Sequence, residues 1–452
     1  MMKDKRVMVI GMGRSGIAAA YALIGEGAQV SVQDSKPAEK IDQDAVKIFE
    51  QKGVDMFFGS VPEDMTGYDF IVVSPGVPLD LGFIVAAEKD GAKVISELEL
   101  AYRLGKGNFV AITGTNGKTT TTTLVGEMFK ASGRTTHVVG NIGVAVVSKS
   151  LHAEADDWLV TEVSSFQLET IETFHPKVSA ILNLTPDHLD RHKTFENYIA
   201  AKAHVFENQT KEDYVVLNFD DPETMKLAPT AKAIVVPFSR MEELPFGAFV
   251  KNDEIVIRDH DEKIISFCRT DELLIPGSHN LENALAATAC AWFAGVEKEA
   301  IVEALTTFAG VEHRIEDCGT VNGVKYINDS KGTNPDAAIK AIQAIKENII
   351  LIAGGYDKGS DFTEFVKEFD GRVKHVILLG STAVKIKDAA EKAGFTKTTI
   401  VKDMDDCVQE AARIANEGDS VLLSPACASW DMYNSYEERG RHFKKCVEAL
   451  KG

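Results

Sequence analysis

The sequence has few cysteines and no long apolar run, and each absence excludes a class of protein. Six cysteines are spread over 452 residues without a CxxC pair, which argues against a disulfide framework and favours a reducing, cytosolic location. No charged-then-apolar leader precedes the first predicted strand, and no apolar stretch approaches the ~20 residues that cross a bilayer. We therefore expect a cytoplasmic protein with no membrane insertion.

Basic residues are also in the minority. The chain has 49 lysines and arginines against 68 acidic residues, a formal net charge of -19. Binding to nucleic acid or to an anionic membrane is therefore not expected, although a local cationic pocket can still hold a phosphate ligand. The chain is 44% hydrophobic and long enough for several globular domains. We expect a monomer.

Short β-branched runs alternate with helical periodicity almost throughout, which is typical of parallel sheets covered by helices. The pattern predicts an α/β protein with three domains. These are a Rossmann-like domain at 1–97, a central P-loop NTPase-like domain at 98–310 and a second Rossmann-like domain at 311–452. Between Lys232 and Cys268 the pattern changes to period-two stretches, which predict a small antiparallel insertion on the central domain.

A glycine-rich turn follows the predicted strand Asn108–Ile112 and precedes a helix. Backbone N–H groups of such a turn can surround a triphosphate, with Lys118 near the β- and γ-phosphates and Thr119 facing Mg²⁺. Ile112 stands where the general P-loop motif has its first glycine. The alternative is an ordinary turn with a surface lysine. The expected ATP-binding residues of the turn are Gly114, Thr115, Asn116, Gly117, Lys118, Thr119 and Thr120.

A second glycine turn lies near the amino terminus. Gly11, Gly13 and Gly16 follow a predicted strand, and Asp34 ends the next strand, as in the dinucleotide-binding fingerprint. Taken alone, this pattern indicates a nicotinamide cofactor, so a dehydrogenase is an alternative function. A nucleotide-binding sensor without catalytic activity is another.

The TGTNGKTT turn resembles that of the Mur ligases and the related folylpolyglutamate synthases, and an ordered series of motifs extends the resemblance over the whole chain. The resemblance implies an ATP-dependent amide-forming ligase that works through an acyl phosphate and a tetrahedral intermediate, with two Mg²⁺ ions. The motifs are Gly140 to Gly143, Glu162 to Leu168, Asp187 to Asp190, Gly277 to Asn283, His313-Arg314 and Asn328 to Asn334.

Lys202 is the most informative single residue. In the predicted helix Thr194–Asn208 it falls on the apolar face, where dehydration would favour the neutral amine. A neutral amine can capture CO₂, and the resulting carbamate is an anionic oxygen ligand suited to Mg²⁺. The alternative is a lysine that extends to solvent.

By resemblance, a few further residues complete the nucleotide and metal site. Lys118, His188 and Lys202 are expected to be catalytic, although His188 could also be an ordinary hydrogen-bonded loop residue. The expected metal ligands are Thr119, Glu162, His188 and carbamylated Lys202. The residues expected to contact ATP outside the glycine turn are Asn283, Arg314 and Asp329.

The same resemblance assigns the other two ligands. The string from Ser424 to Asp431 is similar to the D-glutamate-adding branch of the family, whose substrates are UDP-N-acetylmuramoyl-L-alanine, D-glutamate and ATP, in peptidoglycan precursor synthesis. Trp430 and Tyr436 differ from the residues that many relatives carry, and Lys358 could be a solvated surface charge. The expected substrate-binding residues are Arg14, Ser15, Asp34, Ser35, Lys36, Ser74, Pro75, Gly76, Asn141, Lys331, Thr333, Lys358, Ser429, Trp430 and Tyr436.

Overall fold

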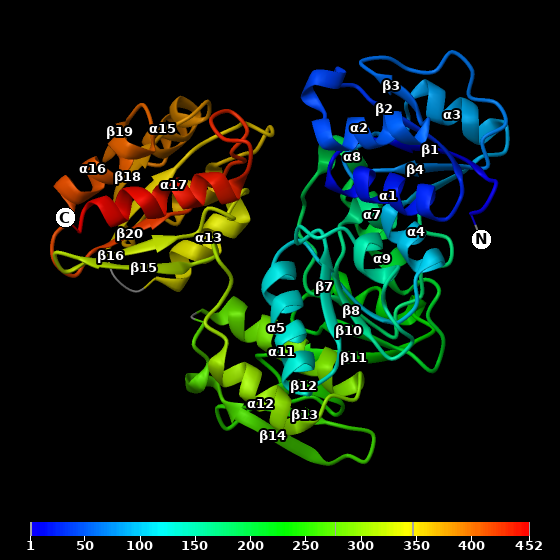
Figure 1. Cartoon of the computed structure of the whole chain (residues 1–452). Coiled ribbons are helices and arrows are strands. Elements are labelled where there is room, and N and C mark those ends of the chain that lie inside the picture. Colours follow the sequence, from blue (N-terminus) through cyan, green and yellow to red (C-terminus); the bar gives the residue numbers. More distant parts are fainter. Residues whose placement is uncertain (1, 276, 346–347, 452) are drawn as a thin grey trace. The chain divides into compact units, whose positions relative to one another are not determined.

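A computed structural model describes residues 2–275, 277–345 and 348–451. Over these residues the chain is an α/β protein with three sheets, which confirms the predicted fold class (Figure 1). The residues form two compact units: unit 1 contains Met1–Leu273 and Leu281–Phe308, and unit 2 contains Leu274–Asn280 and Ala309–Gly452. No helix in the described part of the chain is both long and apolar enough to span a membrane.

The first sheet of unit 1 is a five-stranded parallel sheet in the order β3-β2-β1-β4-β5. Chain order reverses between β1 and β4, and sheets of this kind usually bind ligands in a crevice outside the carboxyl ends of the two strands at the reversal. The strands are β1 (Arg6–Ile10), β2 (Gln29–Asp34), β3 (Asp55–Phe58), β4 (Phe70–Val73) and β5 (Lys93–Ser96). The helices are α1 (Arg14–Gly25), α2 (Gln43–Lys52), α3 (Gly82–Lys89) and α4 (Glu97–Leu104).

The second sheet of unit 1 has nine strands in the order β14-β13-β12-β11-β10-β9-β6-β8-β7. Its strands are β6 (Asn108–Thr113), β7 (Thr136–Gly140), β8 (Trp158–Glu162), β9 (Val178–Ile181), β10 (Tyr214–Asn218), β11 (Ile234–Ser239), β12 (Gly247–Lys251), β13 (Glu254–Arg258) and β14 (Ile264–Arg269). Its helices are α5 (Lys118–Ala131), α6 (Val147–Ser150), α7 (Ser165–Leu168), α8 (Leu189–His192), α9 (Phe195–Ala203), α10 (Pro222–Met225), α11 (Ser278–Phe293) and α12 (Lys298–Thr307).

The segment predicted as an antiparallel insertion differs from the expectation in part. Strands β11 and β12 pair in parallel, whereas the β12–β13 and β13–β14 pairs are antiparallel. All four strands extend the central sheet rather than forming a separate one. The period-two pattern predicted strands here, but strand direction depends on the connections and not on the pattern itself.

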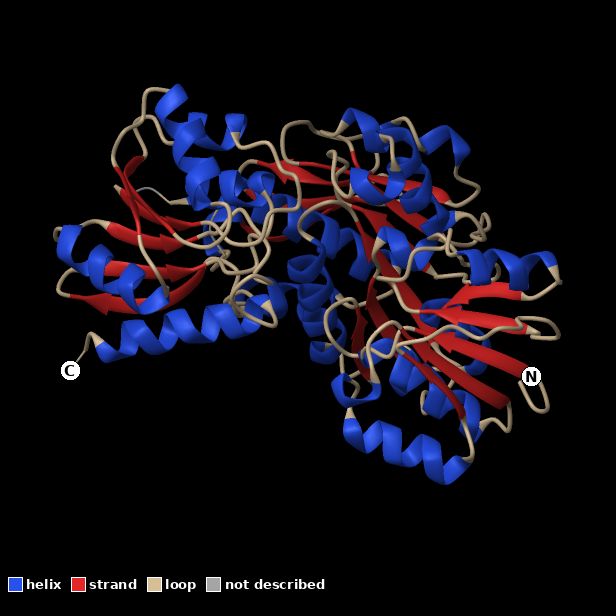
Figure 2. Cartoon of the chain, turned by 90° about the horizontal axis from the view of Figure 1, so that it is seen from above, coloured by secondary structure: helices blue, strands red, loops and turns tan. Residues whose placement is uncertain are grey.

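Unit 2 contains one six-stranded sheet in the order β15-β16-β20-β17-β18-β19, parallel except for β15. Alternate residues of β17 enter two separate apolar cores, Leu351 into one and Ile350 and Ile352 into the other, so helices cover both faces (Figure 2). The strands are β15 (Glu316–Val321), β16 (Val324–Asn328), β17 (Ile349–Ala353), β18 (Val373–Leu378), β19 (Thr398–Ile400) and β20 (Ser420–Leu423). The helices are α13 (Pro335–Ala344), α14 (Thr363–Lys367), α15 (Ala383–Lys392), α16 (Met404–Ile414) and α17 (Tyr436–Ala449).

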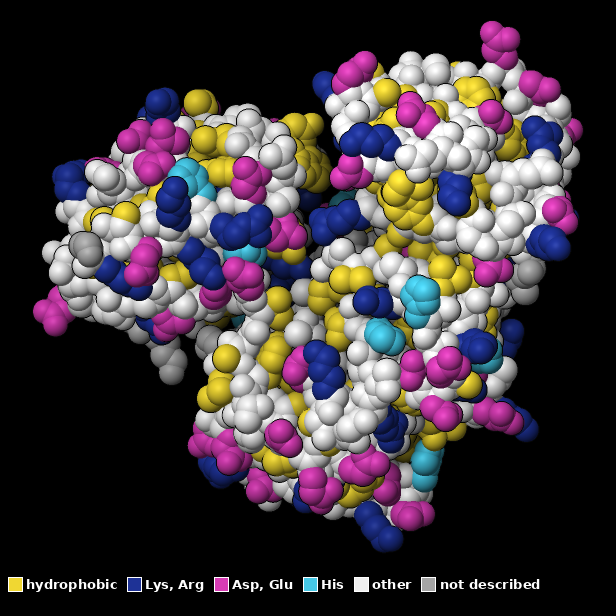
Figure 3. All heavy atoms as spheres, viewed as in Figure 1, with side chains coloured by type: hydrophobic (Ala, Val, Ile, Leu, Met, Phe, Trp, Pro, Cys, Tyr) yellow, Lys and Arg dark blue, Asp and Glu magenta, His cyan; other side chains and the backbone are white. Residues whose placement is uncertain are grey.

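The two sheets of unit 1 share one continuous apolar core. Leu23 of α1, Leu98 of α4 and Val147 of α6 belong to the same buried cluster, together with Val7 of β1 and Phe109 of β6. Burial of this surface is worth about 25 cal/mol per Å², so the two sheets stabilise each other. On the face seen in Figure 3, acidic and basic side chains are interspersed over the surface.

Glu97 is a buried acid inside this shared core and gives a testable pH dependence. The backbone N–H of Val147 donates to its Oε1 at 2.6 Å, whereas its Oε2 has no hydrogen-bond partner among the described residues. Burial raises the pKa of Glu97 from 4.5 to about 7. Between these values the folded state binds more protons than the unfolded state, so the free energy of unfolding falls as pH rises.

The variant Glu97→Gln should therefore be more stable than the parent above pH 7, by up to about 3 kcal/mol, with a smaller difference at pH 5.5. Glutamine keeps an oxygen acceptor for Val147 and removes the buried charge. Urea unfolding of the full-length parent and variant, at pH 5.5 and pH 8.5, measures the difference in the free energy of unfolding. If the free energy of unfolding changed with pH in the same way for both proteins, the raised pKa of Glu97 would be contradicted.

Candidate active site

The glycine turn of the second sheet lies between the end of β6 and the start of α5. Gly114 and Gly117 have φ of +143° and +85°, a backbone region that favours glycine. Asn183, which follows β9, holds the turn from the neighbouring strand. The backbone N–H of Asn116 donates to the Asn183 side-chain oxygen at 2.8 Å, and the Asn183 amide donates to the Asn116 carbonyl at 3.1 Å. The turn is therefore fixed before any ligand arrives.

Two lysines converge on one carbonyl of this turn. The Lys118 ammonium donates to the Gly114 carbonyl at 2.9 Å and to the Thr115 carbonyl at 2.8 Å. The Lys202 Nζ, which comes from α9, donates to the same Gly114 carbonyl at 2.8 Å and lies 3.3 Å from the Thr113 hydroxyl. The Lys118 ammonium and the Lys202 amine therefore meet beside the start of α5, where a helix already favours anions.

Lys202 is buried, with 2% of its surface exposed, so the predicted solvent-extended alternative is wrong for this structure. Its Nζ lies 4.7 Å from the ring centroid of Tyr198. Burial, followed by the charge of Lys118, holds the pKa of Lys202 well below its usual value of 10.5, although Asp187 and Glu162 act in the opposite direction. Both leading causes favour the neutral amine.

Glu162 and Thr119 provide oxygen donors at the same place. Glu162 ends β8 and is 1% exposed. The Thr119 hydroxyl donates to its Oε2 at 2.7 Å, and the Asn141 side-chain amide donates to its Oε1 at 2.9 Å. A carboxylate and a hydroxyl in contact are oxygen donors of the kind that Mg²⁺ prefers, so these residues fit a magnesium ion.

His188 adopts a left-handed backbone, with φ of +52°, at the start of α8. Its ring packs edge-on against Phe166 at 4.9 Å, and Phe166 in turn stacks on His192 at 5.4 Å. His192 is buried; its Nε2 lies 3.0 Å from the Ser165 hydroxyl, and burial lowers its pKa. The charge of Lys202 also lowers the pKa of His192. The sequence analysis therefore missed a second histidine at this site.

Asn283 of α11 lies directly against the glycine turn. A Cβ added to Gly117 would meet the Asn283 side-chain oxygen at 2.2 Å, and the Thr121 hydroxyl lies 3.4 Å from the same oxygen. Asn283 is 4% exposed. The side chain is therefore enclosed beside the turn that is predicted to bind ATP.

The amino-terminal sheet presents its predicted residues at the crevice between β1 and β4. The Asp34 carboxylate accepts hydrogen bonds from the backbone N–H groups of Met12 at 2.7 Å and Lys36 at 2.8 Å. The Ser74 hydroxyl donates to the Gly11 carbonyl at 2.7 Å. Asp34 therefore fixes the shape of the glycine turn, a task that the sequence analysis did not assign to it.

Other predicted residues line the same crevice. A Cβ on Gly16 would meet the Gly11 carbonyl oxygen at 1.9 Å, which explains why glycine stands at this position. The Arg14 guanidinium donates to the Gly143 carbonyl at 3.3 Å, in the loop that carries Asn141. The remaining predicted residues here are exposed or half-buried. They are Ser15, Ser35, Lys36, Pro75 and Gly76.

In unit 2, Arg314 and Asp329 lie close together. Burial raises the pKa of Asp329 to about 6, with the nearby charge of Arg314 acting in the opposite direction. The Ser424 hydroxyl donates to Asp329 Oδ2 at 2.7 Å. The Nε of Arg314 is buried and has no hydrogen-bond partner among the described residues. This guanidinium can therefore still accept an anionic ligand.

The predicted amino-acid pocket is built on three loops of unit 2. They follow the carboxyl ends of β16, β20 and β17, which are adjacent parallel strands. Thr333 and Lys331 lie on the first loop, Ser429 and Trp430 on the second, and Lys358 on the third. Parallel strands place such loops at one edge of the sheet.

The individual side chains of this pocket differ in exposure. Ser429 is buried, Lys358 and Thr333 are half-buried, and Trp430 is 64% exposed with its ring 5.5 Å from Tyr356. The Lys331 ammonium lies 5.2 Å from the ring centroid of Tyr436.

Arg439 holds two of these loops together. It is 1% exposed, and its guanidinium donates to the Ser330 hydroxyl and carbonyl and to the carbonyls of Cys427 and Ala428, at 2.8–3.2 Å. The sequence analysis assigned no role to Arg439. Its position in a helix rich in charged residues gave no sign that the side chain points inward.

The chain is similar to known proteins over its whole length. Three family descriptions match successive segments: "Mur ligase MurD-like, N-terminal domain" at 5–96, "Mur ligase middle domain" at 112–291 and "Mur ligase, glutamate ligase domain" at 313–427. Relatives named UDP-N-acetylmuramoylalanine--D-glutamate ligase are 51% identical in Thermoanaerobacter sp. (strain X514) and 48% identical in Clostridioides difficile (strain 630). The match to the first relative covers 100% of this chain and 99% of the relative, and the match to the second covers 100% of both chains.

Solved structures with the same fold have much lower sequence identity. UDP-N-acetylmuramate-alanine ligase MurC from Thermotoga maritima matches with a TM-score of 0.61 at 21% identity, covering 98% of this chain and 99% of that one. MurF ligase from Thermotoga maritima in complex with ADP matches with a TM-score of 0.59 at 17% identity, covering 99% and 96%. At these identities the similarity concerns the fold.

Proposed function

The chain belongs to the Mur ligase family, and on that premise we propose that it joins D-glutamate to UDP-N-acetylmuramoyl-L-alanine at the expense of ATP, in peptidoglycan precursor synthesis. The observation that carries the proposal is full-length identity of 48–52% to relatives named for this reaction. Dehydrogenase and sensor functions receive no comparable support.

The reaction requires activation of a carboxylate, because oxide is a poor leaving group. In the first step a carboxylate oxygen of the L-alanyl group attacks the γ-phosphorus of ATP, the bond to the β-phosphate oxygen breaks, and ADP leaves. In the second step the D-glutamate amine attacks the acyl phosphate and loses a proton. The tetrahedral intermediate then expels inorganic phosphate. Enzymes accelerate such steps mainly by positioning and charge neutralisation.

The glycine turn and Lys118 are placed to bind the triphosphate. The backbone N–H groups at the start of α5 offer hydrogen bonds to phosphate oxygens. Lys118 now donates to two carbonyls of its own turn, and on nucleotide binding it would exchange these neutral acceptors for charged phosphate oxygens, which form stronger hydrogen bonds. Asn283 lies against the turn. Arg314 and Asp329 of unit 2 are further proposed ATP-binding residues.

Glu162 and Thr119, with His188, would hold magnesium, whose charge offsets the negative phosphate oxygens when it is bound. We assign carbamylated Lys202 to the second ion. The buried, pKa-lowered amine and the acidic residues around it support this assignment. The carbamate would turn a cation that repels Mg²⁺ into an anion that binds it.

The amino-terminal crevice would bind the UDP group of the substrate. Gly11 to Gly16 and the first turn of α1 offer backbone N–H groups to the diphosphate, and Arg14 and Ser15 add side-chain donors. Ser35, Lys36 and the turn from Ser74 to Gly76 would surround the uracil, with Asp34 holding the glycine turn in shape. Asn141 donates to Glu162 from the loop that Arg14 contacts at Gly143.

The loops of unit 2 would bind D-glutamate. Thr333, Lys358 and Ser429 offer a hydroxyl, an ammonium and a second hydroxyl to its carboxylates, and Lys331, Trp430 and Tyr436 would surround them. We further propose that the chain is a cytoplasmic monomer with domain boundaries near residues 97 and 310. This division would give each of the three ligands its own domain.

Phosphate release from ATP tests the proposed function. Purified protein should release phosphate only when both UDP-N-acetylmuramoyl-L-alanine and D-glutamate are present with Mg²⁺. The controls replace D-glutamate with L-glutamate, diaminopimelate or L-alanine, and replace the sugar nucleotide with a folate. Turnover with one of these and none with D-glutamate would reject the substrate assignment, and tight binding of NADH would favour a dehydrogenase instead.

A further inference from the structure

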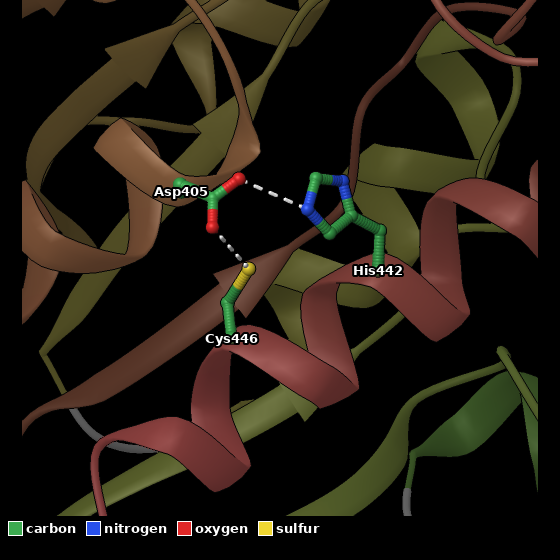
Figure 4. Close-up of side chains that lie close together, drawn as sticks. All are labelled: Asp405, His442 and Cys446. Atoms are coloured by element: carbon green, nitrogen blue, oxygen red, sulfur yellow. Dashed lines mark hydrogen bonds and ion pairs between the residues drawn. The ribbon is translucent and has the colours of Figure 1, made fainter.

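Asp405, His442 and Cys446 converge in unit 2, between α16 and α17. Asp405 lies in the first turn of α16, and the other two residues lie one turn apart on α17 (Figure 4). The His442 Nε2 is 3.0 Å from Asp405 Oδ2, and the Cys446 Sγ is 3.6 Å from Asp405 Oδ1. One ligand atom from each residue lies within 4.8 Å of the other two.

The other nitrogen of His442 has its own partner. Its Nδ1 lies 2.9 Å from the Tyr433 hydroxyl. Tyr433 is held by its backbone N–H, which donates to the Ser429 carbonyl at 2.8 Å. When Nδ1–H donates to this hydroxyl, the Nε2 lone pair points at Asp405 and Cys446. Metal-binding histidines are usually oriented by such a contact on the second nitrogen.

The electrostatic surroundings favour a cation. The Asp405 carboxylate lies beside both His442 Nε2 and Cys446 Sγ, and its negative charge attracts a divalent ion. Such an ion stabilises the thiolate, so binding would release the thiol proton to solvent.

We propose that Asp405, His442 and Cys446 form a zinc site, with water as the fourth ligand. Imidazole, thiolate and carboxylate together suit Zn²⁺, whereas Mg²⁺ prefers oxygen ligands alone. Tetrahedral zinc with these ligands has donor-to-donor distances of about 3.4–3.6 Å, so small side-chain rotations complete the site. The ion links the start of α16 to α17, the helix that also carries Arg439.

A second cluster of possible metal ligands in unit 2 does not fit a metal ion. Glu312, His313 and Glu316 also bring three ligand atoms together. However, the Lys444 ammonium donates to Glu312 at 3.0 Å and to Glu316 at 2.5 Å. A fixed cation therefore already neutralises that cluster, whereas no lysine or arginine is recorded in contact with Asp405 among the described residues.

Cobalt substitution in the full-length protein tests the site. Chelator-treated protein, with excess Mg²⁺ to fill the magnesium sites, is titrated with Co²⁺, whose bond to a thiolate gives a charge-transfer band in the near ultraviolet. We expect one equivalent to produce the band and Zn²⁺ to displace it. Cys446→Ser and His442→Ala should lose it. The matched control is Cys318→Ser, a half-buried cysteine beside the second cluster, which should keep it.

Zinc affinity gives a second test. Tyr433→Phe keeps all three ligands but removes the contact to Nδ1, so it should weaken Zn²⁺ binding by roughly 10–100-fold at unchanged stoichiometry. Unfolding midpoints of the metal-free variants, compared with that of the parent, show that each variant folds. Absence of the band in the parent protein, or a band that survives in Cys446→Ser, would overturn the proposal.

Discussion

Replacing Lys202 with alanine should lower kcat for ligation by at least about 10²-fold while the protein remains folded. The amine lies under the glycine turn, bonded to the Gly114 carbonyl, with Glu162 and Asp187 close enough to affect its pKa. Alanine removes the group that would carry the carbamate, and with it an anionic oxygen ligand of the second magnesium ion. Phosphate release with all three substrates measures the loss.

Two comparisons separate the carbamate from a simple need for positive charge. Lys202→Arg keeps a cation that cannot take up CO₂, so it should be as inactive as the alanine variant. Formate or acetate should restore part of the rate of Lys202→Ala, because a small carboxylate can occupy the vacated space. Lys211→Ala, at an exposed lysine after the same helix, is the control and should be fully active. Substantial turnover by Lys202→Arg would reject the carbamate.

Lys118→Ala should reduce ADP formation by roughly 10²–10³-fold, with or without D-glutamate. The ammonium lies at the start of α5, bonded to the carbonyls of Gly114 and Thr115, where it can reach a bound triphosphate. Its loss removes charge neutralisation at the transferred phosphoryl group, which is the first chemical step. ADP formation in the presence of UDP-N-acetylmuramoyl-L-alanine measures this step.

The control for Lys118 lies on the same helix. Lys130 is near the end of α5 and pairs with Glu127 at 2.8 Å, so Lys130→Ala should form ADP at the parent rate. An unchanged rate of ADP formation in Lys118→Ala would contradict its assigned contact with ATP. A large increase in the KM for ATP at unchanged kcat would instead limit the role of Lys118 to binding.

The parts of the site that could be predicted from sequence are those that follow strands. Thr113 ends β6, Glu162 ends β8 and Asp34 ends β2, and parallel sheets bring such positions to one edge. Lys202 could be predicted because a lysine on an apolar helix face conflicts with the pattern around it. A conflict of this kind often marks a functional residue.

The residues that were missed act through contacts that no local pattern encodes. Asn183 holds the glycine turn from a neighbouring strand, but in sequence it resembles any asparagine after a strand. His192 is buried by Phe166 and Tyr198, which come from other helices. Arg439 is enclosed by two loops distant in sequence, and its helix is rich in charged residues.

The continuous apolar core of unit 1 also constrains how this protein could be divided. Leu98 and Val147 belong to one buried apolar cluster that spans the two sheets. A fragment that begins after residue 97 would therefore expose apolar surface and lose the contact between Glu97 and Val147. The amino-terminal region is therefore a poor candidate for swapping between relatives as an independent module. Any chimera would need to keep α1, α4 and α6 from a single parent.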